Sequence, residues 1–202
     1  MEEVKHVERK RCAWCDLSSP EYIRYHDSQW GVPVYDDRLL FEMLSLEGMQ
    51  AGLSWISILK KRQNFIDAFD NFEVKKVALY DAGKVSELLK NAGIIRNRLK
   101  INAIVKNARV FMDIQREFGS FSTFIWEYVN FKPIQNRYEH FEEIPVKNTL
   151  SERITKDLKK RGMSFVGPVI VYSYMQAIGM INDHETSCFR YLEVGNLSEK
   201  SR

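Results

Sequence analysis

The chain has 202 residues, of which 45% are hydrophobic and 12% aromatic, enough apolar material for one sizeable core. Only 10 glycines and 5 prolines argue against a disordered or turn-rich all-β chain, and no apolar run approaches the roughly 20 residues that cross a bilayer. The net charge of +3 is too small to indicate a nucleic-acid partner by itself. The N-terminal MEEVKHVERKR has no apolar signal stretch, so we expect a cytoplasmic protein without a membrane partner.

The first half of the chain predicts a charged tail over 1–10 and then helices. Ser18-Ser19-Pro20 is typical of a helix start, and Trp30 to Pro33 ends that helix. Asp36-Asp37 caps the next helix, which runs to Glu47-Gly48. Helical spacing resumes from Leu53 to Phe69.

The second half predicts further helices and one long loop. We expect helices over 84–91, 97–117 and 121–130, from Thr149 or Ser151 to Arg161, and from Gly167-Pro168 to Ile178, with a loop over 131–147. Period-two alternation is scarce, so the fold class is all-α. The domain is expected over 11–191 as one helical unit, or two lobes of one unit, followed by a flexible tail over 192–202.

Cysteine and histidine residues pair up near the two ends of the chain. Cys12 and His26 lie near the start, and His184 and Cys188, at i and i+4 on one helix face, lie near the finish. Two thiols and two imidazoles make a full tetrahedral set for zinc, which would pin the termini together. The odd count of 3 cysteines argues against a disulfide framework and fits a reducing compartment.

A glycine-bounded turn joins the last two predicted helices. Gly162 and Gly167 flank Met-Ser-Phe-Val, and the N–H groups that open the second helix are unpaired and electropositive. Such a turn can clamp a phosphate, although an ordinary helical hairpin has the same pattern. The preceding Lys159, Lys160 and Arg161 favour DNA phosphate, whereas each basic cluster alone is typical of a solvated helix face.

Three long segments carry a resemblance to a known family. YIRYHDSQWGVP at 22–33, LFEMLSLEGMQAGLSWISILKKR at 40–62 and FVGPVIVYSYMQAIGMINDH at 165–184 closely resemble 3-methyladenine DNA glycosylase I, of the helix–hairpin–helix superfamily. The resemblance covers about residues 11–190. It implies a helix–hairpin–helix glycosylase fold with a structural zinc site on Cys12, His26, His184 and Cys188. Cys15 matches no ligand of the family and is expected to be a free thiol, with ligand exchange as the alternative from its CxxC spacing.

The resemblance also implies a base pocket. The pattern falls on Tyr22, Tyr25, Glu47 and Trp55, with Glu47 as the catalytic candidate. A purine methylated at N3 is cationic while it is attached to the sugar, so aromatic faces and a carboxylate suit it. From the residues alone, the aromatic side chains would be core packing and Glu47 a carboxylate that caps a helix or forms a salt bridge.

The expected function is therefore a monomeric, monofunctional glycosylase that flips 3-methyladenine out of alkylated duplex DNA and hydrolyses its glycosidic bond. The superfamily's catalytic Asp position holds Asn182, and the hairpin interior has no Lys, so we expect no strand cleavage. Leu53 and Met49 are both candidates for the wedge that fills the vacated stack. The alternative is an inactive, zinc-stabilised DNA-binding module; a zinc hydrolase would need an open coordination position.

Overall fold

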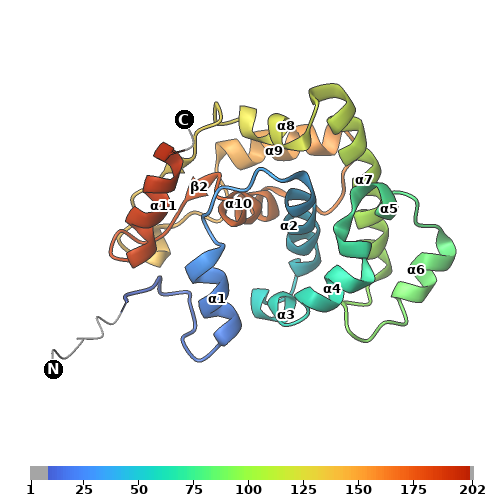
Figure 1. Ribbon diagram of the computed structural model, residues 1–202, viewed down its shortest axis with the longest axis horizontal. Helices are drawn as coiled ribbons and strands as arrows, with labels where there is room; N and C mark the ends of the chain where they lie inside the picture. Colours follow the sequence, from blue (N-terminus) through green and yellow to red (C-terminus); the bar gives the residue numbers. More distant parts are fainter. Residues whose placement is uncertain (1–8, 201–202) are drawn as a thin grey trace.

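The computed structural model describes residues 9–200, and within them the chain is almost entirely helical (Figure 1). In chain order the elements are α1 (Pro20–Ser28), α2 (Asp37–Gln50), α3 (Trp55–Leu59), α4 (Arg62–Ala68), the 3-10 turn η1 (Asp70–Phe72), α5 (Val74–Val77), α6 (Ala82–Leu88), α7 (Arg98–Phe118), α8 (Phe121–Glu127), β1 (Ile134–Gln135), the 3-10 turn η2 (Phe141–Glu143), α9 (Thr149–Lys160), α10 (Pro168–Ala177), β2 (Ile181–Asn182) and α11 (Phe189–Lys200). The all-α prediction is confirmed. None of the described helices is both long and apolar enough to cross a membrane.

Three predicted helix starts are confirmed by their capping hydrogen bonds. The side chain of Ser19 accepts from Tyr22 N, that of Asp36 from Leu39 N, and that of Asn97 from Lys100 N. The single helix expected from Leu53 to Phe69 is instead two, α3 and α4. Apolar periodicity continues across the break because both pieces pack on the same core, so the pattern alone does not reveal it.

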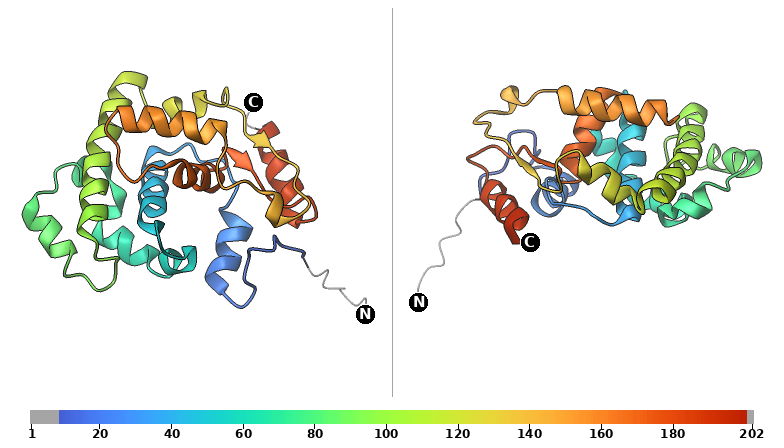
Figure 2. Two further views of the ribbon diagram at one scale, coloured as in Figure 1. Left: turned by 180° about the vertical axis from the view of Figure 1, so that it is seen from behind. Right: turned by 90° about the horizontal axis from the view of Figure 1, so that it is seen from above.

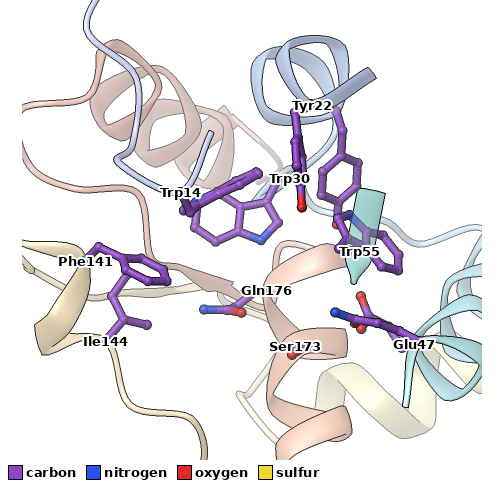
Figure 3. A pocket seen from close by; sticks show the side chains of 11 residues that line it. Trp14, Tyr22, Trp30, Glu47, Trp55, Phe141, Ile144, Ser173 and Gln176 are labelled. Atoms are coloured by element: carbon purple, nitrogen blue, oxygen red, sulfur yellow. The ribbon is translucent and has the colours of Figure 1, made fainter. Parts of the chain in front are cut away.

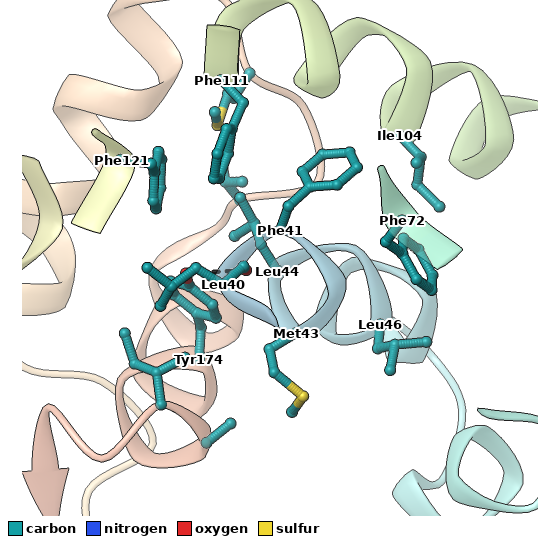
Figure 4. Close-up of a cluster of buried hydrophobic side chains, with 14 of the residues drawn as sticks. Leu40, Phe41, Met43, Leu44, Leu46, Phe72, Ile104, Phe111, Phe121 and Tyr174 are labelled. Carbon is teal, nitrogen blue, oxygen red and sulfur yellow. Dashed lines mark hydrogen bonds between the residues drawn. The ribbon is translucent and has the colours of Figure 1, made fainter. Parts of the chain in front are cut away.

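Helix α2 forms the centre of the hydrophobic core. Its Leu40, Phe41 and Leu46 are fully buried, and it packs against α7, α8 and α10 (Figure 4). The Tyr174 hydroxyl on α10 donates to Leu40 O at 3.1 Å. Because α2 is covered on several sides, its polar residues Glu42, Ser45 and Glu47 are buried.

A short parallel strand pair lies within the segment predicted as a loop. Ile134 of β1 is in register with Ile181 of β2, and Gln135 with Asn182. Strands of two residues are too short to show alternation in a sequence. The pair ties the 131–147 segment to the end of α10.

The C-terminal end differs from the sequence prediction. The expected tail over 192–202 is mostly helix α11, and Val194 is buried. Phe189 N donates to Lys10 O at 3.0 Å, and Asn182 Nδ2 donates to Tyr191 O at 3.0 Å, so packing on the rest of the protein holds this helix. Figures 1 and 2 show α11 beside the N-terminal segment. Most of the predicted 1–10 tail lies outside the described residues.

Candidate functional site

The four residues predicted as metal ligands come together in a buried cluster. Their donor atoms, one each from Cys12, His26, His184 and Cys188, all lie within 4.8 Å of one another. Cys12 precedes α1, His26 is on α1, and His184 and Cys188 follow β2. The cluster therefore joins the two ends of the fold and can hold one metal ion.

The distances in the cluster fit a tetrahedral ion. Bonds of about 2.3 Å to sulfur and about 2.05 Å to nitrogen at tetrahedral angles give sulfur–nitrogen separations of about 3.6 Å. Cys12 Sγ lies 3.3 Å from His184 Nδ1, and Cys188 Sγ lies 3.5 Å from His26 Nε2 and 3.6 Å from His184 Nδ1. The donor set and its spacing suit zinc, with four protein ligands and no open position.

Both imidazoles are oriented by a partner on their other nitrogen. His26 Nδ1 lies 2.8 Å from Asp27 Oδ1, and His184 Nε2 lies 3.1 Å from Trp30 O. Such contacts leave His26 Nε2 and His184 Nδ1 free to bind a metal ion. Arg11 in turn holds Asp27 through an ion pair of 2.7 Å.

Cys15 lies outside this cluster, as predicted. It is buried and forms no disulfide, and burial raises the pKa of its thiol to about 11. His140 is exposed and caps the start of η2. His6 lies outside the described residues.

The four predicted pocket residues line one cavity of about 220 Å³. Tyr22 and Tyr25 come from α1, Glu47 from α2 and Trp55 from α3. The rings of Tyr25 and Trp55 lie 5.4 Å apart, and Figure 3 shows the aromatic side chains along one side of the cavity, with Glu47 near Trp55. The structure thus brings all four together.

Glu47 is a buried carboxyl group without a partner in the described structure. It is 3% exposed, and no described residue forms a hydrogen bond or an ion pair with its side chain. Burial raises the pKa of Glu47 from 4.5 to about 8. A buried, unpaired acid that lines a cavity is typical of a functional site, because a folded interior normally pairs such a group.

Two indole N–H groups of the same pocket are also unpaired. Trp14 Nε1 and Trp55 Nε1 are buried and have no hydrogen-bond partner. Trp14 packs edge-on against Tyr22 and Trp30, with ring centroids 5.8 Å and 4.9 Å apart. The pocket is therefore an aromatic box with spare polar groups, which suits a planar ligand that has hydrogen-bonding edges.

Sequence reasoning missed the other residues that line this pocket. They are Trp14, Trp30, Gln50, Phe141, Ile144, Ser173 and Gln176. The two tryptophans stand beside the metal ligands in sequence, a signal that could have been used. The loop from 139 to 147 gave no such signal, because pairing with distant residues, β1 with β2 and Tyr138 with Glu185, carries it to the pocket.

Asn182 does not line the pocket. It is fully buried in β2, where Nδ2 donates to Gln135 Oε1 at 2.7 Å and Oδ1 accepts from His184 N at 3.2 Å. These contacts order the strand pair and the turn into the metal cluster. Asn182 therefore orders the local backbone and does not reach the pocket.

The predicted helical hairpin is present between α9 and α10, over residues 161–167. Gly162 has a φ of 102°, a backbone conformation that favours glycine. Gly167, with a φ of −68°, caps α10, and a Cβ built there meets no atom within 4 Å. Neither conformation nor internal packing demands glycine at 167, so the free space outside it can admit another molecule.

The basic residues beside the hairpin are not equivalent. Arg161 pairs with both carboxylate oxygens of Glu117 and lies over the rings of Phe118 and Phe124, at 5.1 and 5.2 Å. Lys159 and Lys160 are exposed. Only these two of the three are free to meet phosphate.

The two wedge candidates differ in exposure. Met49 is 1% exposed and belongs to the core, whereas Leu53 is 41% exposed in the turn between α2 and α3. This turn lies between Gln50 and Trp55, both of which line the pocket. Leu53 is thus the candidate that can reach another molecule.

Known proteins of similar sequence and structure point to one family. The sequence profile of the methyladenine glycosylase family matches residues 14–191. The chain is 46% identical over 182 residues to DNA-3-methyladenine glycosylase 1 of Escherichia coli strain K12, covering 90% of this chain and 97% of the relative. It is 44% identical to DNA-3-methyladenine glycosylase of Haemophilus influenzae, over 88% of this chain and 96% of the relative.

Solved structures agree with the sequence relatives. A crystal structure of 3-methyladenine DNA glycosylase I superposes with a TM-score of 0.86 at 47% identity, covering 89% of this chain and 98% of that one. A structure of the Staphylococcus aureus enzyme, described as the basis of its 3-methyladenine recognition, has the same TM-score at 40% identity, covering 89% and 95%. The family match spans the pocket, the hairpin and three of the four cluster residues, with Cys12 just outside it, and this chain belongs to the methyladenine glycosylase family.

Proposed function

We propose that this protein is a monofunctional DNA glycosylase that releases 3-methyladenine from alkylated DNA by hydrolysing the N-glycosidic bond. The observation that carries the proposal is Glu47, a buried carboxyl group without a partner in a pocket of aromatic rings. Relatives at 44–46% identity are named as DNA-3-methyladenine glycosylases.

The pocket chemistry suits a cationic methylated purine. The rings of Tyr22, Tyr25 and Trp55 offer π faces that attract the positive charge. Ionised Glu47 would accept hydrogen bonds from the exocyclic amine and stabilise the same charge. The base departs neutral, so the glycosidic bond needs little further activation, consistent with the structural role of Asn182.

The DNA would be held at two places. The N–H groups at the start of α10, beside the free space at Gly167, would bind a backbone phosphate, with Gly162 shaping the turn. Leu53 would enter the stack that the flipped nucleotide vacates. Replacing Gly167 with Asp should weaken binding to damaged and undamaged duplex alike, with a shallower salt dependence.

The metal would be structural zinc. Its four ligands leave no position for water or substrate, so zinc supplies a cross-link between the ends of the chain rather than hydrolytic chemistry. Metal analysis should find one zinc per chain, and Cys188→Ala should lower both the zinc content and the melting temperature. Full zinc with unchanged stability in that variant would remove Cys188 from the ligand set.

The product would be an intact strand with an abasic site. An amine that forms a Schiff base has to reach the sugar. The hairpin interior holds no Lys, and the buried Lys100 of α7 donates its ammonium to two backbone carbonyls. Borohydride during turnover should trap no protein–DNA adduct.

The deciding experiment measures release of 3-methyladenine from alkylated duplex DNA by the purified protein. Release at a rate proportional to the enzyme concentration supports the proposal. Binding to duplex without release would instead identify an inactive DNA-binding module.

We also propose a monomer in the cytoplasm. Light scattering of the purified protein should give the mass of one chain, and fractionation of cells would test the cytoplasmic location.

A further inference from the structure

One face of α7 carries two buried polar residues that are seven positions apart. Lys100 is 7% exposed and Asn107 is 6% exposed. Residues seven apart lie two turns along the same helix face, separated by about 10 Å. Polar side chains are seldom buried on a core-facing helix surface unless they have partners, and each of these has a specific one.

Lys100 holds the turn that carries Leu53. Its ammonium crosses from α7 and donates to Met49 O at 2.8 Å and Ala51 O at 2.5 Å, at the C-terminal end of α2. These carbonyls carry the negative end of the helix dipole, and a cation there is favourable. Burial lowers the pKa of Lys100. The two carbonyls replace water that the buried ammonium loses.

Asn107 holds the hairpin in the same way. Its Nδ2 donates to Ser164 O at 2.9 Å, and its Oδ1 accepts from Ser164 N at 2.9 Å. The paired bonds fix the backbone orientation in the middle of the hairpin. The hairpin also contacts α2, because a Cβ at Gly48 would lie 3.5 Å from Phe165.

We propose that Lys100 and Asn107 are positioning residues that set the spacing between the turn that opens the duplex and the hairpin that binds its phosphate. This inference rests on the proposed function. A rigid helix that grips both turns fixes how far the wedge stands from the anchored strand, and this distance decides whether the lesion reaches the pocket. Neither residue lines the pocket, so neither touches the base.

The test compares duplex with single-stranded substrate. Lys100→Met keeps the apolar stem and removes the two bonds, so it should lower kcat/KM on alkylated duplex DNA at least tenfold. Two other measurements should stay within about threefold of the wild type, because neither needs the wedge. They are excision from the same DNA as separated strands, and binding of free 3-methyladenine measured by tryptophan fluorescence. Lys100→Arg, which can still donate to both carbonyls, should recover most of the duplex activity.

Asn107→Ala tests the other end of the same face and covers the case in which Lys100→Met does not fold. It should show the same duplex-specific loss, and Lys75→Met, an exposed lysine on α5, controls for lost charge. Equal losses on duplex and single strands, or unchanged duplex activity in a folded variant, would overturn the inference. A wild-type protein without glycosylase activity would instead overturn the proposed function, so the two failures are distinguishable.

Discussion

Two glutamates of α2, five residues apart, are both buried but differ in whether their carboxyl groups have partners. Glu42 is 1% exposed and pairs with Arg38 at 3.0 Å and Arg62 at 2.7 Å. Glu47 is 3% exposed and has no partner among the described residues. The interior pairs the Glu42 carboxylate with two arginines and leaves the Glu47 carboxyl group unpaired beside the pocket. Burial alone therefore does not identify a functional acid; burial without a partner does.

The largest expected effect is the loss of excision activity caused by Glu47→Gln. The amide keeps the shape but loses the negative charge that would stabilise a cationic base, so excision of 3-methyladenine should fall by on the order of 10²–10³-fold. Release of base from alkylated duplex, measured on protein whose circular dichroism matches the wild type, checks this. Full activity would return Glu47 to a structural role and place recognition elsewhere in the pocket.

The same substitution should make the protein more stable at neutral pH. The pKa of Glu47 rises from 4.5 to about 8 on folding, so between these values the folded state keeps a proton that the unfolded chain has lost. Wild-type stability therefore falls as the pH rises through this window, and at pH 7 the penalty reaches about 3 kcal/mol. Glu47→Gln does not have this penalty, because an amide does not ionise.

Urea unfolding of both proteins at about pH 5 and about pH 8 measures this difference. The advantage of Glu47→Gln should be small at the lower pH and grow toward the higher. If the difference in unfolding free energy between the two proteins does not change with pH, burial of the ionised carboxylate is not what destabilises the wild type. Gained stability together with lost activity would mark the group as one kept for function.

Glu42→Gln should behave in the opposite way. It leaves two guanidinium groups without their shared carboxylate, and since both arginines are partly exposed and can turn to water, we expect a loss of about 2 kcal/mol in unfolding free energy. Excision per folded molecule, measured well below the melting temperature, should stay within about threefold. A Glu42 variant with unchanged stability and lost excision would contradict the structural role assigned to Glu42.

The smallest expected effect is a proton released on binding. Empty, the pocket holds Glu47 mostly protonated at pH 7, because its pKa is about 8. A base that donates hydrogen bonds to the carboxylate favours its ionised form, so binding of 3-methyladenine should release close to one proton, and affinity should weaken about tenfold per pH unit below 8. Calorimetry in buffers of different ionisation enthalpy counts the proton, and Glu47→Gln should release none.

Interactions between residues close in sequence explain why most of the helices could be predicted. Ser19, Asp36 and Asn97 cap helices through side chains within three residues of the N–H they accept from, which is a sequence-local event. The split of α3 from α4, the β1–β2 pair and the helix α11 depend on contacts with distant segments. Those are the places where the sequence prediction was incomplete or wrong.

The fold class, the four candidate metal ligands and four of the pocket residues could be predicted from the sequence. Thiol and imidazole are distinctive ligands, and the resemblance carried Tyr22, Tyr25, Glu47 and Trp55 to one place. Three-dimensional packing is needed to see that Leu53 rather than Met49 is exposed, that Asn182 orders a strand pair, and that Glu47 is unpaired while Glu42 is not. Exposure and pairing are properties of what the rest of the chain places around a side chain, and so no local stretch of sequence contains them.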